Sequence, residues 1–430
     1  MDPLAPVPVV VPLGAAAVLA AGTTLLRRRV ADAISVGTAA GTAGLATWLL
    51  VRAGPGPIEY WFGGWAPRGG SVLGVALAVD RLGAGLAAFV AVLVTAALVF
   101  SWRYFDTVGT LFHVLLLVFL AAATGFALAG DLFTMFVLFE VLSVSAYALT
   151  GYRIEHRAPL QAGLNFAVVN SLGALAVLIG IALLYARTGW LNLAKIGQAL
   201  TGAPADGLVV VALAFLLGGF LVKAAAVPVH FWLGDAYAVA PTPVGVVFAG
   251  ALTELGIFGA TRVYWTVFSG VRGDHDALGT VLLVVGVATA AVAAIMAFEQ
   301  RHLKRLIAFV TISHSGIMLA GVSTLDAGGL TGASLYAVAD GAVKAALFLA
   351  IGILLHRLGS VDEDDLRGRG RGMPVVAGVF VLAGLGLAGL PPFGTEVGKL
   401  LMDHAASAAG RGWVPPLVAA VSVLTGGAVL

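Results

Sequence analysis

The sequence predicts an all-α polytopic membrane protein with about 13 to 14 transmembrane helices, on three observations. The chain of 430 residues is 60% hydrophobic and only 11% charged, with a mean hydropathy of +1.02, whereas soluble domains carry about 25% charged residues. Apolar runs of bilayer length recur from the N-terminus to the last residue. Glycine contributes 57 residues, and small residues let membrane helices approach closely.

Thirteen apolar segments are predicted to span the bilayer. We expect the first to be retained, because the basic run Arg27–Arg29 follows it, whereas a signal peptide has its basic residues in front. The thirteen predicted spans are 9–26, 31–51, 75–100, 108–128, 131–152, 160–186, 208–239, 243–268, 278–298, 303–324, 330–356, 374–408 and 413–430.

The seventh and twelfth spans are too long for one simple crossing, and both contain proline: Pro228 in the seventh, Pro391 and Pro392 in the twelfth. Proline removes a backbone donor and clashes with the preceding turn. We therefore predict that both helices are broken, which a membrane protein tolerates where the break lines a cavity or is buried. The breaks lie five spans apart, which indicates two repeats, spans 4–8 and 9–13.

Basic residues predict the orientation, because cytoplasmic loops are enriched in Lys and Arg. Loops after odd-numbered spans hold thirteen such residues, Lys304 and Arg305 among them, and loops after even-numbered spans hold six, Arg68 among them. Arg262 lies near a span end, where its side chain can reach the interface. The chain is therefore expected in the cell (plasma) membrane with its N-terminus outside.

Several ionisable residues fall within predicted spans, where a charge costs about 2.5–3.5 kcal/mol at the bilayer centre. Such residues are retained where they face water or a partner, so we interpret them as a proton path. His230 and His314 are added as shuttles, because histidine titrates near neutral pH. The predicted path consists of Glu140, Lys223, Glu254, Asp340, Lys344, Lys399, His230 and His314.

Each of these residues also has a structural interpretation. Glu140 fits a structural ion pair, and Lys223 fits a charge bound to a carbonyl freed by the break. Glu254 fits a counter-ion of Lys223 as well as it fits a relay. Asp340 and Lys344 are spaced i, i+4 and pair on one helix face.

The remaining candidates are Lys399 and the two histidines. Lys399 follows the second break, with Glu396 three residues before it. Lone histidines such as His230 and His314 are often structural.

Other chemistry is not indicated. The chain has no Cys, which excludes disulfides and Cys-ligated clusters. It contains no phosphate-binding Gly-Lys-Ser/Thr loop, no His-Glu-x-x-His motif and no nucleophile elbow. We therefore predict no cofactor, no metal site, no nucleic-acid partner and no active site of its own. A membrane enzyme with its own site is the weakest alternative.

Four motifs resemble one known family. Segment 219–244 (GFLVKAAAVPVHFWLGDAYAVAPTPV) is similar to the signature of the antiporter-like subunits of respiratory complex I, Mrp sodium/proton antiporters and membrane-bound hydrogenases. Three further stretches are similar to the same family: 131–147 (DLFTMFVLFEVLSVSAY), 304–316 (KRLIAFVTISHSG) and 389–399 (GLPPFGTEVGK).

The resemblance implies two inverted five-helix repeats with broken helices 7 and 12, and a proton half-channel in each repeat. The implied division is 1–107 for helices 1–3, 108–268 for the first repeat and 278–430 for the second. By motif, Glu140 matches the fifth-helix glutamate, Lys223 the seventh-helix lysine and Lys399 the twelfth-helix lysine of many members.

This sequence also departs from the family pattern. Glu254 stands where many members have Lys, and Asp340 where many have His before Lys344. Members usually have about fourteen helices, so the C-terminal end looks short.

The resemblance predicts a proton-translocating, antiporter-like subunit of a multi-subunit membrane complex, of the NADH:quinone oxidoreductase or hydrogenase type. Its expected partners are other membrane subunits, the lipid bilayer and protons. The first alternative is the D-type subunit of an Mrp Na⁺/H⁺ antiporter, which adds Na⁺ as a transported ion. The second alternative is a structural membrane scaffold with an inactive channel.

Overall fold

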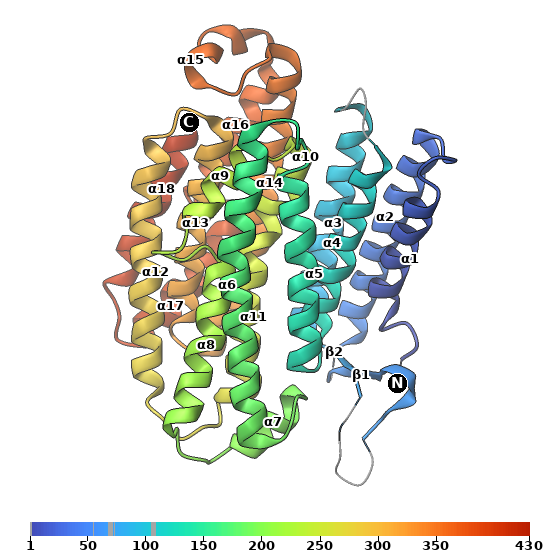
Figure 1. Ribbon diagram of the computed structural model, residues 1–430. Coiled ribbons are helices and arrows are strands. Elements are labelled where there is room, and N and C mark those ends of the chain that lie inside the picture. Colours follow the sequence, from blue (N-terminus) through green and yellow to red (C-terminus); the bar gives the residue numbers. More distant parts are fainter. Residues whose placement is uncertain (1, 55, 68–71, 73, 105–108) are drawn as a thin grey trace. The chain divides into compact units, whose positions relative to one another are not determined.

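The computed structural model describes residues 2–54, 56–67, 72, 74–104 and 109–430 (Figure 1). Arg68 and the first residue of the predicted fourth span, at position 108, lie outside the described residues. Within them, the protein is built almost wholly of helices, with one small two-stranded sheet.

The thirteen predicted spans each have a counterpart among the helices. In the described part of the chain, nine helical segments are long and apolar enough to cross a membrane: α2 (Arg28–Arg52), α3 (Arg81–Tyr104), α4 (Thr110–Leu128), α5 (Leu132–Thr150), α6 (Arg157–Thr188), the run α10–η2–α11–η3 (Thr242–Phe268), α12 (His275–Phe298), α13 (Leu303–Val322) and α14 (Ala327–Leu358). Four shorter apolar helices complete the set: α1 (Val7–Ala21), α8 (Gly207–Lys223), α16 (Pro374–Leu387) and α18 (Val414–Val429). The predicted polytopic all-α class is therefore confirmed.

The helices group into two compact units. Unit 1 comprises 1–152, 167–221 and 258–273, and unit 2 comprises 153–166, 222–257 and 274–430. These boundaries come from packing, and the predicted division at 107 and 268 into repeats stays a prediction.

Unit 1 begins its third helix later than predicted. Residues Ala76–Val79 form strand β2, which pairs antiparallel with β1 (Ile58–Trp61), and α3 starts only at Arg81. The start predicted at 75 was wrong because these apolar residues bond to a neighbouring strand instead of continuing the helix. The carboxylate of Asp80 then accepts a hydrogen bond from the Gly83 amide at 2.8 Å, which satisfies one of the free donors at the helix start.

Arg262 in unit 1 binds Asp80 through two parallel hydrogen bonds instead of simply reaching solvent. Burial alone would raise the pKa of the Asp80 carboxyl, but the hydrogen bonds and charge of Arg262 bring that pKa below its usual value. The same guanidinium lies 5.0 Å from the Phe258 ring centre. This residue therefore joins α11 (Thr253–Val263) to the start of α3.

Unit 1 also contains a short amphipathic helix, α7 (Leu193–Leu200), in a stretch predicted as a loop. Asn192 caps it by accepting a hydrogen bond from the Lys195 amide at 3.2 Å. A side chain at Gly197 would collide with the backbone of Thr266, so glycine is needed for the contact between α7 and η3 (Tyr264–Phe268).

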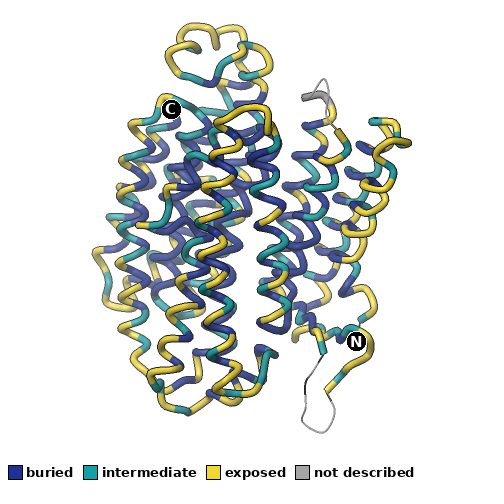
Figure 2. The backbone as a smooth tube through the Cα atoms, in the orientation of Figure 1, coloured by how far each residue is buried: buried dark blue, intermediate teal, exposed yellow. Residues whose placement is uncertain are grey.

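Unit 2 surrounds the buried helix α13, of which every residue from Leu306 to Val322 is buried. A side chain on Gly316 would meet the backbone of Gly286 and Ala290 on α12. These two helices therefore pack with small residues at their interface, as membrane helices do. The loop between α14 and α16, which carries α15 (Glu363–Leu366), extends beyond the helix ends and is exposed (Figures 1 and 2).

The first predicted break in unit 2 is present. Helix α8 ends at Lys223, and α9 (Phe231–Val239) begins only after the chain has passed Pro228. Neighbouring side chains bind the freed backbone groups. The Ser315 hydroxyl donates to the Ala224 carbonyl at 2.7 Å, and the Thr289 hydroxyl accepts from the Val227 amide at 3.0 Å. These bonds meet the requirement that backbone polar groups inside a membrane protein be satisfied.

The second predicted break is also present, between α16 and α17 (Gly394–Ala408), and contains Pro391 and Pro392. Gly389 there has a φ of 69°, a left-handed conformation that favours glycine. The Thr395 hydroxyl donates to the Gly386 carbonyl, and the Lys399 ammonium donates to the Gly389 carbonyl at 3.3 Å. A hydroxyl and a charged side chain thus bind freed carbonyls at this break.

Candidate functional site

A continuous line of ionisable side chains runs through unit 2. Lys344 Nζ lies 3.1 Å from Glu254 Oε1 and 2.7 Å from Asp340 Oδ2. Asp340 Oδ1 lies 2.7 Å from His314 Nδ1, and His314 Nε2 lies 2.9 Å from the hydroxyl of Thr425. The line therefore connects α11, α14, α13 and α18, and we call Glu254, Lys344, Asp340 and His314 the buried line.

Helical spacing explains how α14 contributes to this line. Tyr336, Asp340 and Lys344 follow one another at intervals of four, so they share one helix face. All three are 0% exposed, as is His314, and Glu254 is 3% exposed. The Tyr336 hydroxyl lies 3.0 Å from His314 Nδ1. The predicted i, i+4 pair of Asp340 and Lys344 is thus confirmed, as part of a larger network.

The charge of the buried line depends on one proton. Two carboxylates face one ammonium, so the line carries a net charge of −1 when His314 is neutral and both acids are ionised. A buried uncompensated charge is costly. A proton on either Glu254 or His314 brings the sum to zero, and these residues lie at opposite ends of the line. The two neutral arrangements differ only in where that proton is held.

Both ends of the line have a hydroxyl that accommodates either state. The Thr253 hydroxyl is 3.0 Å from Glu254 Oε2 and can donate to a carboxylate or accept from a carboxylic acid. The Thr425 hydroxyl can donate to neutral His314 Nε2. When His314 is protonated, the Thr425 hydroxyl can instead accept a hydrogen bond from Nε2 and donate to the carbonyl of Val421, 3.1 Å away. Rotation of two hydroxyls therefore suffices to satisfy hydrogen bonds in both states.

Lys223 is the last residue of α8 and is 0% exposed. Its ammonium lies 5.5 Å from the ring centre of Phe166, and that ring stacks on Trp232 with centroids 4.3 Å apart. An aromatic face attracts a cation by about 0.5–2 kcal/mol. The structure therefore places Lys223 directly before the first break, on an aromatic stack formed by α6 and α9.

Lys399 lies in the first half of α17 and is 8% exposed. Its ammonium is 2.9 Å from Glu396 Oε2. The two residues, three apart in the sequence, therefore form an ion pair on one face of α17. Among the residues that the structure describes, no hydrogen bond or ion pair joins this pair to the buried line.

Two other predicted path residues lie outside the buried line. His230 directly precedes α9, is half-buried and hydrogen-bonds with the backbone of Pro228. Glu140 lies on α5 in unit 1, also half-buried, seven residues before Tyr147 on the same face. Because Lys223 belongs to unit 2, the pairing of Glu140 with Lys223 stays a prediction.

The structure places Lys304 differently from the prediction based on sequence. It is one of the basic residues assigned to loops, but the structure buries it to 5% exposure in the first turn of α13. Its ammonium donates to the Ala240 carbonyl, 2.9 Å away at the end of α9, where a cation is favoured by the helix dipole. The neighbouring Arg305 pairs with Asp235 at 2.6 Å and stays half-exposed.

Sequence reasoning missed several other residues of the site. Tyr336 was detectable, because it shares its spacing with Asp340 and Lys344. Thr425 was not, since it lies 111 residues from its partner His314 in an ordinary apolar helix. In unit 1, Asp32 and His113 also form a buried pair at 2.7 Å, and neither residue lies in a motif that would have indicated it.

This fold, with two broken helices and ionisable side chains enclosed among apolar spans, defines a polytopic membrane protein. A model of the family described as NADH:quinone oxidoreductase/Mrp antiporter, TM, matches residues 129–425. The chain belongs to this family.

Relatives come from two kinds of complex. The NADH-quinone oxidoreductase subunit N of Desulforudis audaxviator is 32% identical over 341 residues, which cover 78% of this chain and 66% of that protein. A Na(+)/H(+) antiporter subunit of Bacillus subtilis, of the D type, is 30% identical over 310 residues, covering 71% and 61% respectively. The chain thus spans less than two thirds of the length of either relative.

A solved structure agrees with the sequence matches. A chain of the Mrp complex from Dietzia sp. DQ12-45-1b superposes with a TM-score of 0.90 at 29% identity, covering 100% of this chain and 79% of that chain. The predicted family resemblance is therefore confirmed.

Proposed function

We propose that this protein is a proton-translocating, antiporter-like subunit of a multi-subunit membrane complex. The observation that carries the proposal is the buried line, in which four ionisable side chains bond to one another within 3.1 Å across three helices. The two acids of this line face one lysine and one histidine, so its charge is balanced only while a proton is held on Glu254 or on His314.

In this proposal, a proton moves along the line between Glu254 and His314. Lys344 passes a proton to Asp340 and is reprotonated by Glu254. Asp340 then passes its proton to Nδ1 of a neutral His314 that carries its hydrogen on Nε2 and donates it to Thr425. Lys223 and Glu140 load the line: Glu140 holds Lys223 protonated, and weakening of that pair sends the proton towards Glu254. Lys399 and Glu396 then exchange protons with solvent near the second break.

The experiment is proton uptake by everted membrane vesicles from cells that express the full chain with its membrane partners. His314→Gln retains hydrogen-bonding groups towards Asp340 and Thr425 but cannot carry the proton. We expect coupled proton uptake to fall at least about tenfold, because a single proton-transfer group contributes that much or more, with the amount of assembled protein unchanged. Lys195→Met, in α7 and outside the line, is the control.

Unchanged uptake in His314→Gln would refute the role of the buried line. Lys223→Ala tests the loading step separately. If uptake is normal in Lys223→Ala but lost in His314→Gln, the path reaches the line without Lys223.

Exchange of a metal cation for protons is the second candidate, favoured by the likeness to the antiporter subunit of Bacillus subtilis and to the Mrp complex. A redox-coupled pump takes up protons at a rate that does not depend on added Na⁺ or K⁺. An antiporter subunit requires one of these ions on the opposite side. Titration of each cation in the same vesicles distinguishes the two.

A structural scaffold with an inactive channel makes the opposite prediction. Glu140→Gln would then change neither proton uptake nor growth at alkaline pH while assembly stays intact. We expect uptake to fall instead, because a neutral amide cannot hold Lys223 charged.

We also propose that the N-terminus lies outside the cell membrane. The excess of basic residues in loops after odd-numbered spans supports this orientation. The chain contains no Cys, so single cysteines at Leu4 and Gly370 can be labelled selectively. A membrane-impermeant maleimide should label Leu4→Cys but not Gly370→Cys in intact cells, and the reverse pattern would invert the orientation.

A further inference from the structure

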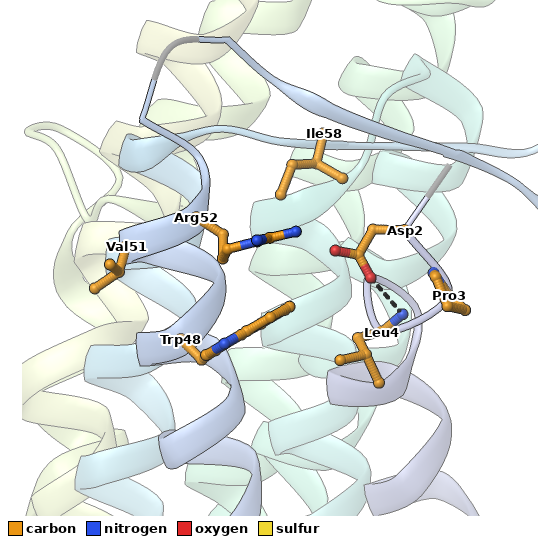
Figure 3. Close-up of a pocket in the computed structure, with 7 residues that line it drawn as sticks. All are labelled: Asp2, Pro3, Leu4, Trp48, Val51, Arg52 and Ile58. Carbon is orange, nitrogen blue, oxygen red and sulfur yellow. Dashed lines mark hydrogen bonds between the residues drawn. The ribbon is translucent and has the colours of Figure 1, made fainter.

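A surface pocket of about 700 Å³ lies in unit 1, between the first residues of the chain and the end of α2 (Figure 3). It is built from three segments: the turn before α1, the last two turns of α2 and the start of β1. Its lining consists of Asp2, Pro3, Leu4, Trp48, Val51, Arg52 and Ile58. The proposed proton path uses none of these residues.

Two opposite charges face each other across this pocket. The side chains of Asp2 and Arg52 point towards one another in Figure 3, and no ion pair joins them in the described structure. The Asp2 carboxylate is held in place by a hydrogen bond from the Leu4 amide at 3.0 Å. The Arg52 guanidinium lies 5.2 Å from the centre of the Trp48 ring, a position that cation–π attraction stabilises. Both charges are therefore fixed with space between them.

The two helices beside the pocket expose apolar side chains. Trp48 and Arg52 occupy the last two turns of a transmembrane helix, where tryptophan marks the bilayer interface. Below them, α1 exposes apolar side chains, with Val10 at 53% and Val18 at 58% exposure, and Val51 beside the pocket is 77% exposed. A ligand with a charged end and long apolar chains fits this surface.

We propose that the pocket binds the headgroup of a zwitterionic phospholipid that carries a primary ammonium, of the phosphatidylethanolamine class. The phosphate accepts hydrogen bonds from the Arg52 guanidinium, and the ammonium donates to the Asp2 carboxylate. The acyl chains lie along α1 and α2. An anionic phospholipid with a glycerol headgroup satisfies Arg52 but offers no cation to Asp2, so the pocket discriminates between the two lipids.

The test is lipid retention by the purified full-length protein, measured by native mass spectrometry after incubation with equal amounts of phosphatidylethanolamine and phosphatidylglycerol. We expect the wild type to retain phosphatidylethanolamine about threefold or more over phosphatidylglycerol, the scale of one exposed ion pair. Asp2→Asn keeps an oxygen for the Leu4 amide but removes the charge, so the ratio should approach one. Arg52→Gln should reduce retention of both lipids.

Arg29→Gln is the matched control, because Arg29 is exposed at the opposite end of α2. Equal retention of the two lipids by wild type would overturn the proposal, as would a preference that survives Asp2→Asn. A protein chain covering this pocket in the assembled complex would overturn it too. In that case, cysteines at Val51 and Ile58 would crosslink to another subunit, and the complex would retain neither lipid there.

Discussion

The buried line and the Lys399–Glu396 pair place lysines in two different environments within unit 2. Lys344 lies between two carboxylates, and its side chain and that of Asp340 are both 0% exposed. Lys399 has one carboxylate, at 2.9 Å, and the side chains of that pair are 10% and 19% exposed. The first environment holds its lysine between two carboxylates and is closed to solvent, whereas the second has one carboxylate at ion-pair distance and is partly open. In the proposed function, this difference assigns proton storage to the line and proton exchange with solvent to the pair.

The largest expected effect follows from Lys344→Met, which leaves two carboxylates buried without their cation. Breaking a buried pair costs about 3–5 kcal/mol. We expect a large fall in the thermal unfolding temperature of the detergent-purified protein, or loss of the protein from the membrane. Lys195→Met provides the control. If the unfolding temperature of Lys344→Met fell no further than that of Lys195→Met, within experimental error, the line would be neutral without its lysine.

Lys399→Met should destabilise less, by about 1–2 kcal/mol, because water partly reaches Glu396 and replaces the missing ammonium. It also frees the Gly389 carbonyl. The comparison fails if this variant loses as much stability as Lys344→Met in the same unfolding assay. In that event, the second environment is as closed as the first.

A double replacement tests the charge count directly. Adding Glu254→Gln to Lys344→Met removes one of the two unpaired carboxylates, so we expect about 1–2 kcal/mol of the lost stability to return. Glu254→Gln alone, measured beside it, completes the double-mutant cycle. Additive losses would contradict direct coupling between the two side chains.

Thr425→Val removes the hydroxyl that serves His314 in both protonation states. The loss of one buried hydrogen bond costs about 1 kcal/mol, and the substitution preserves side-chain shape. We expect a small fall in unfolding temperature but a larger relative fall in proton uptake, since only uptake requires both states. Thr331→Val is a suitable reference, because this exposed threonine on α14 bonds only within its own helix.

The Asp80–Arg262 pair in unit 1 provides a test of an ion pair outside the buried line. The pKa of Asp80 is lowered from 3.8 in the folded protein, so its stabilising contribution is complete above that value and is lost as pH falls through the lower pKa. The gap in unfolding temperature between wild type and Asp80→Asn should therefore be constant from about pH 7 to about pH 5 and shrink below the unfolded value. A gap that grows on acidification would reverse the assignment.

The sequence was sufficient for features that depend on local pattern. Hydropathy located the thirteen spans, proline located both breaks, and helical spacing paired Asp340 with Lys344. Contacts between distant segments were not accessible in this way. Nothing in the sequence near Lys304 indicates that its ammonium ends on the Ala240 carbonyl, because the packing of α9 against α13 decides its burial.

The predicted start of the third helix was wrong for a related reason. Apolar residues at 76–79 fit a helix or a strand equally well, and the choice was made by pairing with 58–61. The placement of His314 against Thr425 likewise required a contact across 111 residues.

Helix α14 runs without interruption from Ala327 to Leu358, and this continuity limits how the protein can switch. Asp340 and Lys344 are one turn apart on a rigid rod, so their separation stays nearly constant while the helix stays intact. In the proposed function, a gate would therefore act at the outer members of the line, by displacing the segment that carries Glu254 or the helix that carries His314. A signal from a neighbouring subunit would have to reach those two elements to change where the proton rests.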